Sequence, residues 1–195
     1  MPTGWEWITD TPATRQTERA PGEGKWLFAV MAPGWHITTR PGAVLYEPSY
    51  AGRGRYAVEA ETFLFPGTSQ SGFGLMIGGR DLDGPAPHYT AFLVRRDGSV
   101  AVERRAGAQS TMLVEWANGP SVATGPADRP IRNLLRVDVE PAAARLLVNG
   151  EVVAEVARPA EEFAGQVGLR IGADTDIHVS TLDLTLKMAL PRPTP

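Results

Sequence analysis

The segment from residue 55 to residue 65 constrains the fold of this chain more than any other. Its side chains alternate: Tyr56, Val58, Ala60, Thr62 and Leu64 share one face, and Ala57, Glu59, Glu61, Phe63 and Phe65 share the other. A period of two predicts a β-strand. At about 3.3 Å per residue the strand is roughly 36 Å long, which is enough to cross a whole β-sandwich.

Two dipeptides mark tight turns between apolar runs. Asn149-Gly150 separates Leu146–Val148 from Val152–Val156, and Asp97-Gly98 separates Tyr89–Val94 from Val100–Glu103. Both dipeptides favour the type I′ turn, because its two central residues need a positive φ. The sequence therefore predicts two β-hairpins. The expected cross-strand pairs are Val148 with Glu151, Leu146 with Val153, Ala91 with Arg104, and Thr90 with Arg105.

Further short runs follow the same pattern along the chain, at the spacing of roughly 8–12 residues that is typical of sandwiches and barrels. We expect strands at Trp26–Met31, Trp35–Thr38, Ala43–Tyr46, Phe73–Ile77, Met112–Trp116, Leu134–Val139, Val167–Ile171 and Ile177–Leu186, and at most one helical turn at Pro159–Phe163. The chain is therefore predicted to be all-β, with two antiparallel sheets in a single sandwich.

The composition excludes several classes of function. The 195 residues carry a net charge of −3, so neither nucleic acid nor an anionic membrane is suggested as a partner. Cysteine is absent, which excludes disulfides and thiolate chemistry. The longest wholly apolar run, Trp26 to Ala32, is far shorter than the about 20 residues that span a bilayer. The first residues lack a signal-peptide pattern, so we expect a soluble protein.

The chain divides into an arm, one domain and a tail. Residues 1–25 are rich in Thr, Pro, Gly and charge and form the arm, residues 26–188 form the β-sandwich domain, and residues 189–195 form a Pro-rich tail. Within the arm, Trp5, Trp7 and Ile8 are spaced for alternate packing. We expect them to cover an edge of the sandwich.

Several motifs resemble those of one superfamily. They are Gly34–Thr38, Tyr56–Phe65, Phe73–Gly79, Tyr89–Arg95, Asn133–Val137, Val148–Gly150 and Gly165–Arg170. Together they resemble the concanavalin A-like lectin/glucanase superfamily, and within it the laminin-G-like and 3-keto-disaccharide-hydrolase-like domains of bacteria. The resemblance implies a jelly-roll sandwich. It leaves function open, because the superfamily includes sugar binders, glycosidases and modules without a known ligand.

The strand that carries catalysis in family 16-like glucanases of this superfamily is altered here. Those enzymes have a Glu-x-Asp-x-x-Glu strand, whereas this chain has Glu59-Ala-Glu61-Thr-Phe63-Leu64, without the central Asp or a third carboxylate. A retaining glycosidase needs two carboxyl groups roughly 5–5.5 Å apart. Because phenylalanines share the face of the glutamates, we predict that Glu59 and Glu61 do not form a catalytic pair.

Two loops carry a pair of aspartates. Asp81-x-Asp83-Gly84 and Asp174-x-Asp176 place carboxylates at i and i+2, a spacing that can hold Ca²⁺. Asp also forms turns without any metal, which explains both pairs. We therefore expect no cofactor, with calcium at these loops as the alternative.

The three histidines have no metal-binding spacing. His36, His88 and His178 lie far apart in the sequence, which argues against a histidine metal site. The alternation of the last strand places His178 on the same face as Leu182 and Leu184. We expect His178 to be a structural histidine.

The candidate binding site lies beside the stretch from Gly72 to Trp116. The loop from Gly79 to Pro87 concentrates polar and turn residues, and loops on a rigid scaffold commonly carry function. The following hairpin adds guanidinium groups, and aromatic rings add stacking surface. The predicted ligand-binding residues are Arg80, Asp81, Asp83, His88, Tyr89, Arg104, Arg105 and Trp116. Of the two arginines, Arg104 is expected to share the sheet face of Tyr89.

These observations predict a non-catalytic binding or accessory module, with a glycan or a small acidic ligand as its partner. Two alternatives stay open. One is a glycoside-cleaving or sugar-modifying enzyme like the 3-keto-disaccharide hydrolases, which would show carboxylates converging in a cleft. The other is a structural or self-assembling β domain, which would show a large apolar patch or a sheet edge used for contacts.

Overall fold

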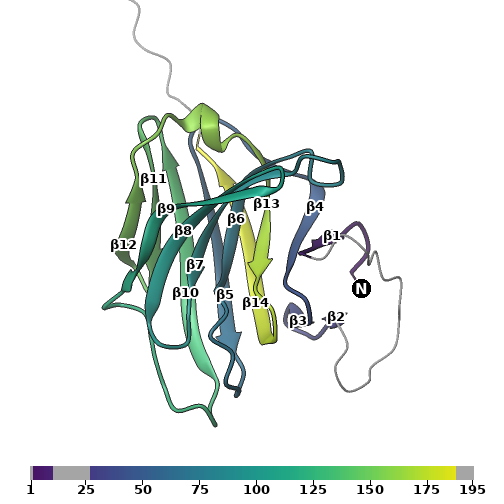
Figure 1. Ribbon diagram of the computed structural model, residues 1–195, viewed down its shortest axis with the longest axis vertical. Helices are drawn as coiled ribbons and strands as arrows, with labels where there is room; N and C mark the ends of the chain where they lie inside the picture. Colours follow the sequence, from purple (N-terminus) through teal and green to yellow (C-terminus); the bar gives the residue numbers. More distant parts are fainter. Residues whose placement is uncertain (1, 11–26, 188–195) are drawn as a thin grey trace, which may run out of the picture.

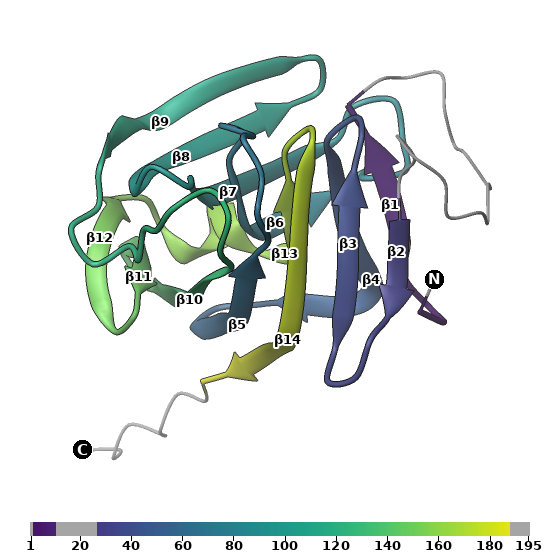
Figure 2. The same cartoon turned by 90° about the horizontal axis from the view of Figure 1, so that it is seen from below.

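The computed structural model describes residues 2–10 and 27–187, which form two antiparallel sheets of seven strands each (Figures 1 and 2). Sheet A contains, in spatial order, β1 (Glu6–Thr9), β4 (Ala43–Gly52), β13 (Gly165–Ile171), β6 (Phe73–Arg80), β7 (His88–Val94), β8 (Ser99–Ala106) and β9 (Gln109–Asn118). Sheet B contains β12 (Glu151–Val156), β11 (Ala143–Val148), β10 (Ile131–Glu140), β5 (Tyr56–Leu64), β14 (Thr175–Leu186), β3 (Trp35–Thr39) and β2 (Leu27–Val30). The predicted all-β sandwich is confirmed.

The predicted strands are present, and most of them extend further than expected. For example, β9 covers Gln109–Asn118 instead of Met112–Trp116. The helical turn is η1 (Ala160–Phe163), at one end of the sandwich (Figure 1). Trp26, most of the arm and the Pro-rich tail lie outside the described residues. Within the described part of the chain, no helix is long and apolar enough to cross a membrane.

The alternating segment forms β5, between β10 and β14 in the middle of sheet B. Tyr56, Val58 and Ala60 point into the core and are fully buried, as the alternation predicts. The Tyr56 hydroxyl donates to the Phe163 carbonyl at 2.6 Å, which ties η1 to the core. Burial raises the pKa of Tyr56, so this hydroxyl keeps its proton.

The described part of the arm, residues 2–10, covers one edge of the sandwich, as predicted. β1 pairs with β4 and forms an edge of sheet A (Figure 2). The Trp5 ring lies 5.4 Å from the ring of Phe28 on β2 and 5.1 Å from that of Trp35 on β3, measured between centroids. These aromatic contacts join the edge of sheet A to the edge of sheet B, so residues close to the N-terminus are part of the sandwich.

The Asn149-Gly150 turn joins β11 to β12, as the sequence predicts. Both residues have positive φ, 51° and 92°, and Val148 lies opposite Glu151. A β-bulge then shifts the register, so that Leu146 faces Ala154 instead of Val153. The Asn149 side chain accepts from Leu134 N at 3.0 Å and donates to the Ser121 carbonyl at 2.8 Å.

Replacing Gly150 by valine is expected to lower the free energy of unfolding by about 1–2 kcal/mol, because a β-branched residue resists positive φ. Urea denaturation measures the loss. Gly67→Val is the matched control, since both glycines have open space around a built Cβ but Gly67 has no positive φ. Equal stability of the two variants would contradict the backbone explanation.

A second bulge interrupts the alternation of β14. Val179 pairs with Thr62 and Thr181 pairs with Glu61, so the residue between them has no partner on β5. Side chains after the bulge change face: Leu182 and Leu184 pack against the core, while His178 lies outside beside Phe63, at 6.2 Å between ring centroids. The predicted face shared by His178 and Leu182 is therefore wrong, since one extra residue reverses the faces.

The outer face of sheet B carries a network of ion pairs. Glu59 pairs with Arg136 at 3.2 Å, and Glu61 pairs with Arg132 at 2.6 Å. The network continues through Asp138, Glu140, Lys187 and Arg55. Each glutamate thus has an arginine partner on β10, which gives both a structural role. Their lack of catalytic activity remains a prediction.

This network predicts a loss of stability in acid. Burial alone would raise the pKa of Asp138, but Arg136 and Lys187 donate to its carboxylate and hold that pKa below the ordinary 3.8. Arg55, followed by Lys187, lowers the pKa of Glu140 below the ordinary 4.5. Because these pKa values are depressed by folding, the stabilisation is present above the ordinary values and is lost as the pH falls through the folded-state values.

We expect the urea midpoint to be constant from about pH 7 to 5.5 and to fall below about pH 4.5. Asp138→Asn should cost about 1 kcal/mol at pH 7, because two cations lose their shared carboxylate. The difference between the variant and the wild type should shrink as the pH falls through the folded-state pKa of Asp138. A difference that persists unchanged in acid would contradict the assignment.

Candidate functional site

The outer face of sheet A carries a second hydrophobic cluster, which we call the outer cluster. Its buried members are Val44, Tyr46, Met76, Leu82, Tyr89, Ala91 and Leu93, and Ile8 and Trp116 pack against them. Apolar side chains on an outer sheet face need a cover. Here Ile8 of β1 and Leu82 of the β6–β7 loop supply part of it, so the edge strand β1 and this loop both contribute to the same face.

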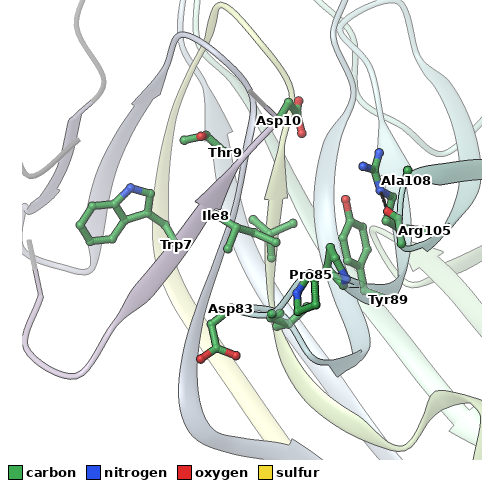
Figure 3. A pocket seen from close by; sticks show the side chains of 14 residues that line it. Trp7, Ile8, Thr9, Asp10, Asp83, Pro85, Tyr89, Arg105 and Ala108 are labelled. Carbon is green, nitrogen blue, oxygen red and sulfur yellow. Dashed lines mark hydrogen bonds between the residues drawn. The ribbon is translucent and has the colours of Figure 1, made fainter. Parts of the chain in front are cut away.

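A pocket of about 410 Å³ opens between these covering segments (Figure 3). Its lining combines apolar side chains with carboxylates, a phenol and a guanidinium. The lining residues are Trp7, Ile8, Thr9, Asp10, Val44, Leu82, Asp83, Gly84, Pro85, Pro87, Tyr89, Arg105, Gly107 and Ala108. Pockets for small ligands have roughly this volume and this mixture of apolar walls with a few polar groups.

The β6–β7 loop is shaped by Asp81. This residue has a φ of 53°, its carbonyl accepts from Gly84 N at 3.0 Å, and its carboxylate accepts from Ala86 N at 3.0 Å. The resulting turn buries Leu82 in the outer cluster and leaves Asp83 exposed on the pocket. In the described part of the chain, no side chain or backbone group pairs with the Asp83 carboxylate. Asp81 is therefore a turn former, and Asp83 is a free hydrogen-bond acceptor.

The β7–β8 hairpin brings Arg105, not Arg104, to Tyr89. The loop has three residues, since Val94 pairs with Val100 and Arg95 N donates to the Ser99 carbonyl. Gly98, with φ 88°, closes it, and Asp97 has no positive φ. The predicted two-residue turn at Asp97-Gly98 is therefore wrong. The register moves by one residue, which reverses the faces.

The corrected register separates the two arginines. Tyr89 lies opposite Arg105, and Thr90 lies opposite Arg104. The Arg104 guanidinium donates to Glu162 of η1 at 2.8 Å, on the other side of the sheet from Tyr89. That contact lowers the pKa of Glu162. Arg104 thus attaches η1 to β8, while Arg105 lines the pocket.

Tyr89 supplies a protonated hydroxyl to the pocket. Burial raises the pKa of Tyr89; the charge of Arg170 opposes this effect, and Asp10 and Glu103 add to it. The phenol therefore stays neutral at physiological pH. Among the described residues its hydroxyl has no hydrogen-bond partner, so it is available both to donate to and to accept from a ligand.

An ion pair holds the end of β1 against sheet A. Arg170 of β13 donates to the Asp10 carboxylate at 2.9 Å and to the Ile171 carbonyl at 3.1 Å. The Arg170 side chain is 13% exposed and that of Asp10 is 45% exposed. Burial disfavours the Arg170 charge, but Tyr89 and Asp10 outweigh it and raise the pKa of Arg170. Asp10 therefore forms part of the pocket wall because a buried cation fixes it there.

Three of the eight predicted site residues, Asp83, Tyr89 and Arg105, line this pocket. Arg80, Asp81, His88, Arg104 and Trp116 do not. His88 Nδ1 lies 2.6 Å from the Ala86 carbonyl and supports the loop. Trp116 packs on the outer cluster, and the Arg95 guanidinium stacks 3.5 Å from its ring centroid, so it flanks the site on the same sheet face.

Sequence reasoning missed the contribution of the arm. Ile8, Thr9 and Asp10 reach the pocket through the pairing of β1 with β4, and Arg170 reaches Asp10 across 160 positions of sequence. The spacing of Trp5, Trp7 and Ile8 was the available signal. That spacing predicted that the arm docks at an edge of the sandwich. It did not predict on which sheet face β1 would line a pocket.

Three of the four aspartates in the two pairs, Asp81, Asp174 and Asp176, are engaged within the protein. Asp174 lies 3.2 Å from Arg40, and Asp176 lies 3.1 Å from His36 Nε2. Asp81 accepts from its own loop, as described above. Within residues 2–10 and 27–187, no three or more His, Asp or Glu side chains are arranged to hold a metal ion.

Solved structures share this fold at low sequence identity. The carbohydrate-binding module CBM66 from Bacillus subtilis has a TM-score of 0.66 and 13% identity, covering 94% of this chain and 96% of that module. A protein of unknown function with a galectin-like fold, also from Bacillus subtilis, has a TM-score of 0.61 and 12% identity, covering 93% and 88%. Sheep galectin-11 has a TM-score of 0.51 and 15% identity, covering 69% and 92%.

These likenesses show the fold alone, which is the two-sheet β-sandwich that the sequence motifs imply. In sequence comparisons, neither a protein-family profile nor a curated protein matches the chain.

Proposed function

We propose that this protein is a non-catalytic carbohydrate-binding module whose site is the pocket on the outer face of sheet A. One observation carries the proposal: polar groups without internal partners line a pocket with apolar walls. The Asp83 carboxylate and the Tyr89 hydroxyl are such groups, and Ile8 and Pro85 lie beside them (Figure 3). Sugars present hydroxyls at their edges and C–H groups on their faces, which matches this mixture.

The similar solved structures support the same proposal. One is named a carbohydrate-binding module and another a galectin. Fold likeness by itself is an associational argument, because one fold hosts many functions. The pocket chemistry supplies the physical part. A catalytic role is less well supported, because Glu59 and Glu61 lie on the other sheet and are paired with arginines.

A glycan-array screen followed by amide NMR titration tests the proposal. We expect at least one glycan to bind and to shift the amides of residues 8–10, 82–89 and 105–108. Shifts confined to the Asn149-Gly150 hairpin would contradict the site. Release of a cleaved product from the bound glycan would contradict the non-catalytic assignment.

Removing divalent metal is expected to leave binding unchanged. The Asp83 carboxylate can accept ligand hydroxyls directly, and Asp81 is committed to its loop. The measurement is titration of the protein with the selected glycan, once in about 1 mM Ca²⁺ and once in EDTA. About 1 mM Ca²⁺ would saturate a calcium site of ordinary extracellular affinity, and EDTA would remove the ion. Loss of binding in EDTA that calcium restores would support the calcium alternative instead.

A further inference from the structure

We infer that the pocket takes a neutral sugar unit and rejects uronic acids, and that Asp83 sets this selectivity. The inference rests on the proposed function and concerns the same site. It follows from which charges of the pocket are already paired and which are free.

Asp83 is the free carboxylate of the pocket, whereas Asp10 accepts from Arg170 through one of its two oxygens. Asp83 lines the pocket, is exposed, and has no partner among the described residues. Asp10 also lines the pocket, with almost half of its side chain exposed and only one edge facing Arg170. Ionised carboxylates accept hydrogen bonds and donate none. They therefore attract the hydroxyls of a neutral sugar and repel the carboxylate of a uronic acid.

The guanidinium groups are largely committed. Arg170 is not among the lining residues and is paired with Asp10. Arg105 donates from Nε to the Gly107 carbonyl at 2.5 Å and from Nη1 to Ser110 Oγ at 3.5 Å. Recognition of a carboxylate favours a free bidentate edge of an arginine. Each bidentate edge of Arg105 thus has one nitrogen engaged, and its remaining N–H groups suit a single hydroxyl or ring oxygen.

The other lining groups complement a neutral sugar. Tyr89 remains protonated, so it donates to a hydroxyl oxygen without adding charge. Figure 3 shows Ile8 and Pro85 between Asp10 and Asp83, with Tyr89 to one side. The C–H face of a sugar ring can lie on these apolar groups while its hydroxyls reach the carboxylates on either side.

The test compares matched oligosaccharide pairs of equal linkage and length, one ending in a neutral sugar and the other in the corresponding uronic acid. The array spans several such pairs, and calorimetry measures the Kd of each binder. We expect the Kd of the neutral member to be lower by at least about tenfold. A difference of this size corresponds to one contact that discriminates by charge. This preference should shrink in about 1 M salt, because salt screens the repulsion.

Substitution of Asp83 should change the preference itself. Asp83→Lys should shift the neutral-to-uronate ratio of Kd values at least about tenfold toward the uronate, and Asp83→Asn should shift it in the same direction by less. Asp128→Lys is the control, because it makes the same change of net charge at an exposed loop position outside the pocket. Its ratio should equal that of the wild type.

The outcomes separate this inference from the proposed function. Tighter binding of the uronate members by the wild type would overturn the inference and leave a carbohydrate-binding function in place. An unchanged ratio in Asp83→Lys would overturn the role of Asp83. Failure of every neutral and acidic glycan to bind would overturn the proposed function, and the inference with it.

Discussion

Replacing Ala108 by tryptophan is expected to weaken glycan binding at least about 100-fold, equivalent to about 2.7 kcal/mol of binding free energy. Ala108 is an exposed residue in the β8–β9 turn and lines the pocket beside Arg105 (Figure 3). An indole at this position would occupy space that the ligand needs. Exposed turn substitutions usually change stability by less than about 0.5 kcal/mol, so the fold should remain intact.

Calorimetric titration with the glycan selected by the array measures this effect. The matched control is Ala117→Trp, since Ala117 is also exposed, on β9, but lies outside the pocket lining. That variant should bind like the wild type. Undiminished binding by Ala108→Trp, with its urea midpoint unchanged, would place the ligand elsewhere on the molecule.

Replacing Arg170 by methionine is expected to lower the free energy of unfolding by about 1–2 kcal/mol and to weaken glycan binding about tenfold. Methionine keeps most of the side-chain volume but leaves Asp10 without its cation. We expect a smaller loss of stability than for a fully buried ion pair, because the Asp10 side chain is 45% exposed. Arg170 does not line the pocket, so weaker binding would report the loss of the wall that it holds.

Hydrogen exchange provides the second measurement for this variant. Amides of residues 6–9 should exchange faster, because β1 is an edge strand that loses the ion pair at its end. Arg145→Met is the matched control: Arg145 pairs with Glu155 at 2.6 Å, and both side chains are about half exposed. It should change stability by less than about 0.5 kcal/mol. Normal binding and exchange in Arg170→Met would show that other contacts fix β1.

Local sequence patterns predicted the elements of this fold well. The alternation of β5 was sufficient to assign its core-facing and outer faces, because side chains of a strand point to opposite sides. Asn149-Gly150 was sufficient to place a type I′ turn, because few residues tolerate two successive positive φ angles. These features depend on neighbouring residues alone, so they can be read from the chain.

Register could not be predicted in the same way. Asp97-Gly98 fits a two-residue turn by composition, yet the hairpin uses a three-residue loop, so Arg105 rather than Arg104 reaches Tyr89. The bulge between Val179 and Thr181 reverses the faces of β14 for the same reason. One extra residue in a turn or a bulge changes the local free energy little, so the local sequence does not fix its position. Its position is decided by which side chains the whole sandwich must bury.

The sequence by itself determined an all-β sandwich and its hairpin between β11 and β12, because turn chemistry and alternation are local properties. The tertiary structure decided which of the candidates meet, and it added Asp10 and Arg170, which lie 160 positions apart in the chain. The physical reason is that a pocket forms where separate segments pack together. Here the segments that pack against the outer cluster also line the pocket.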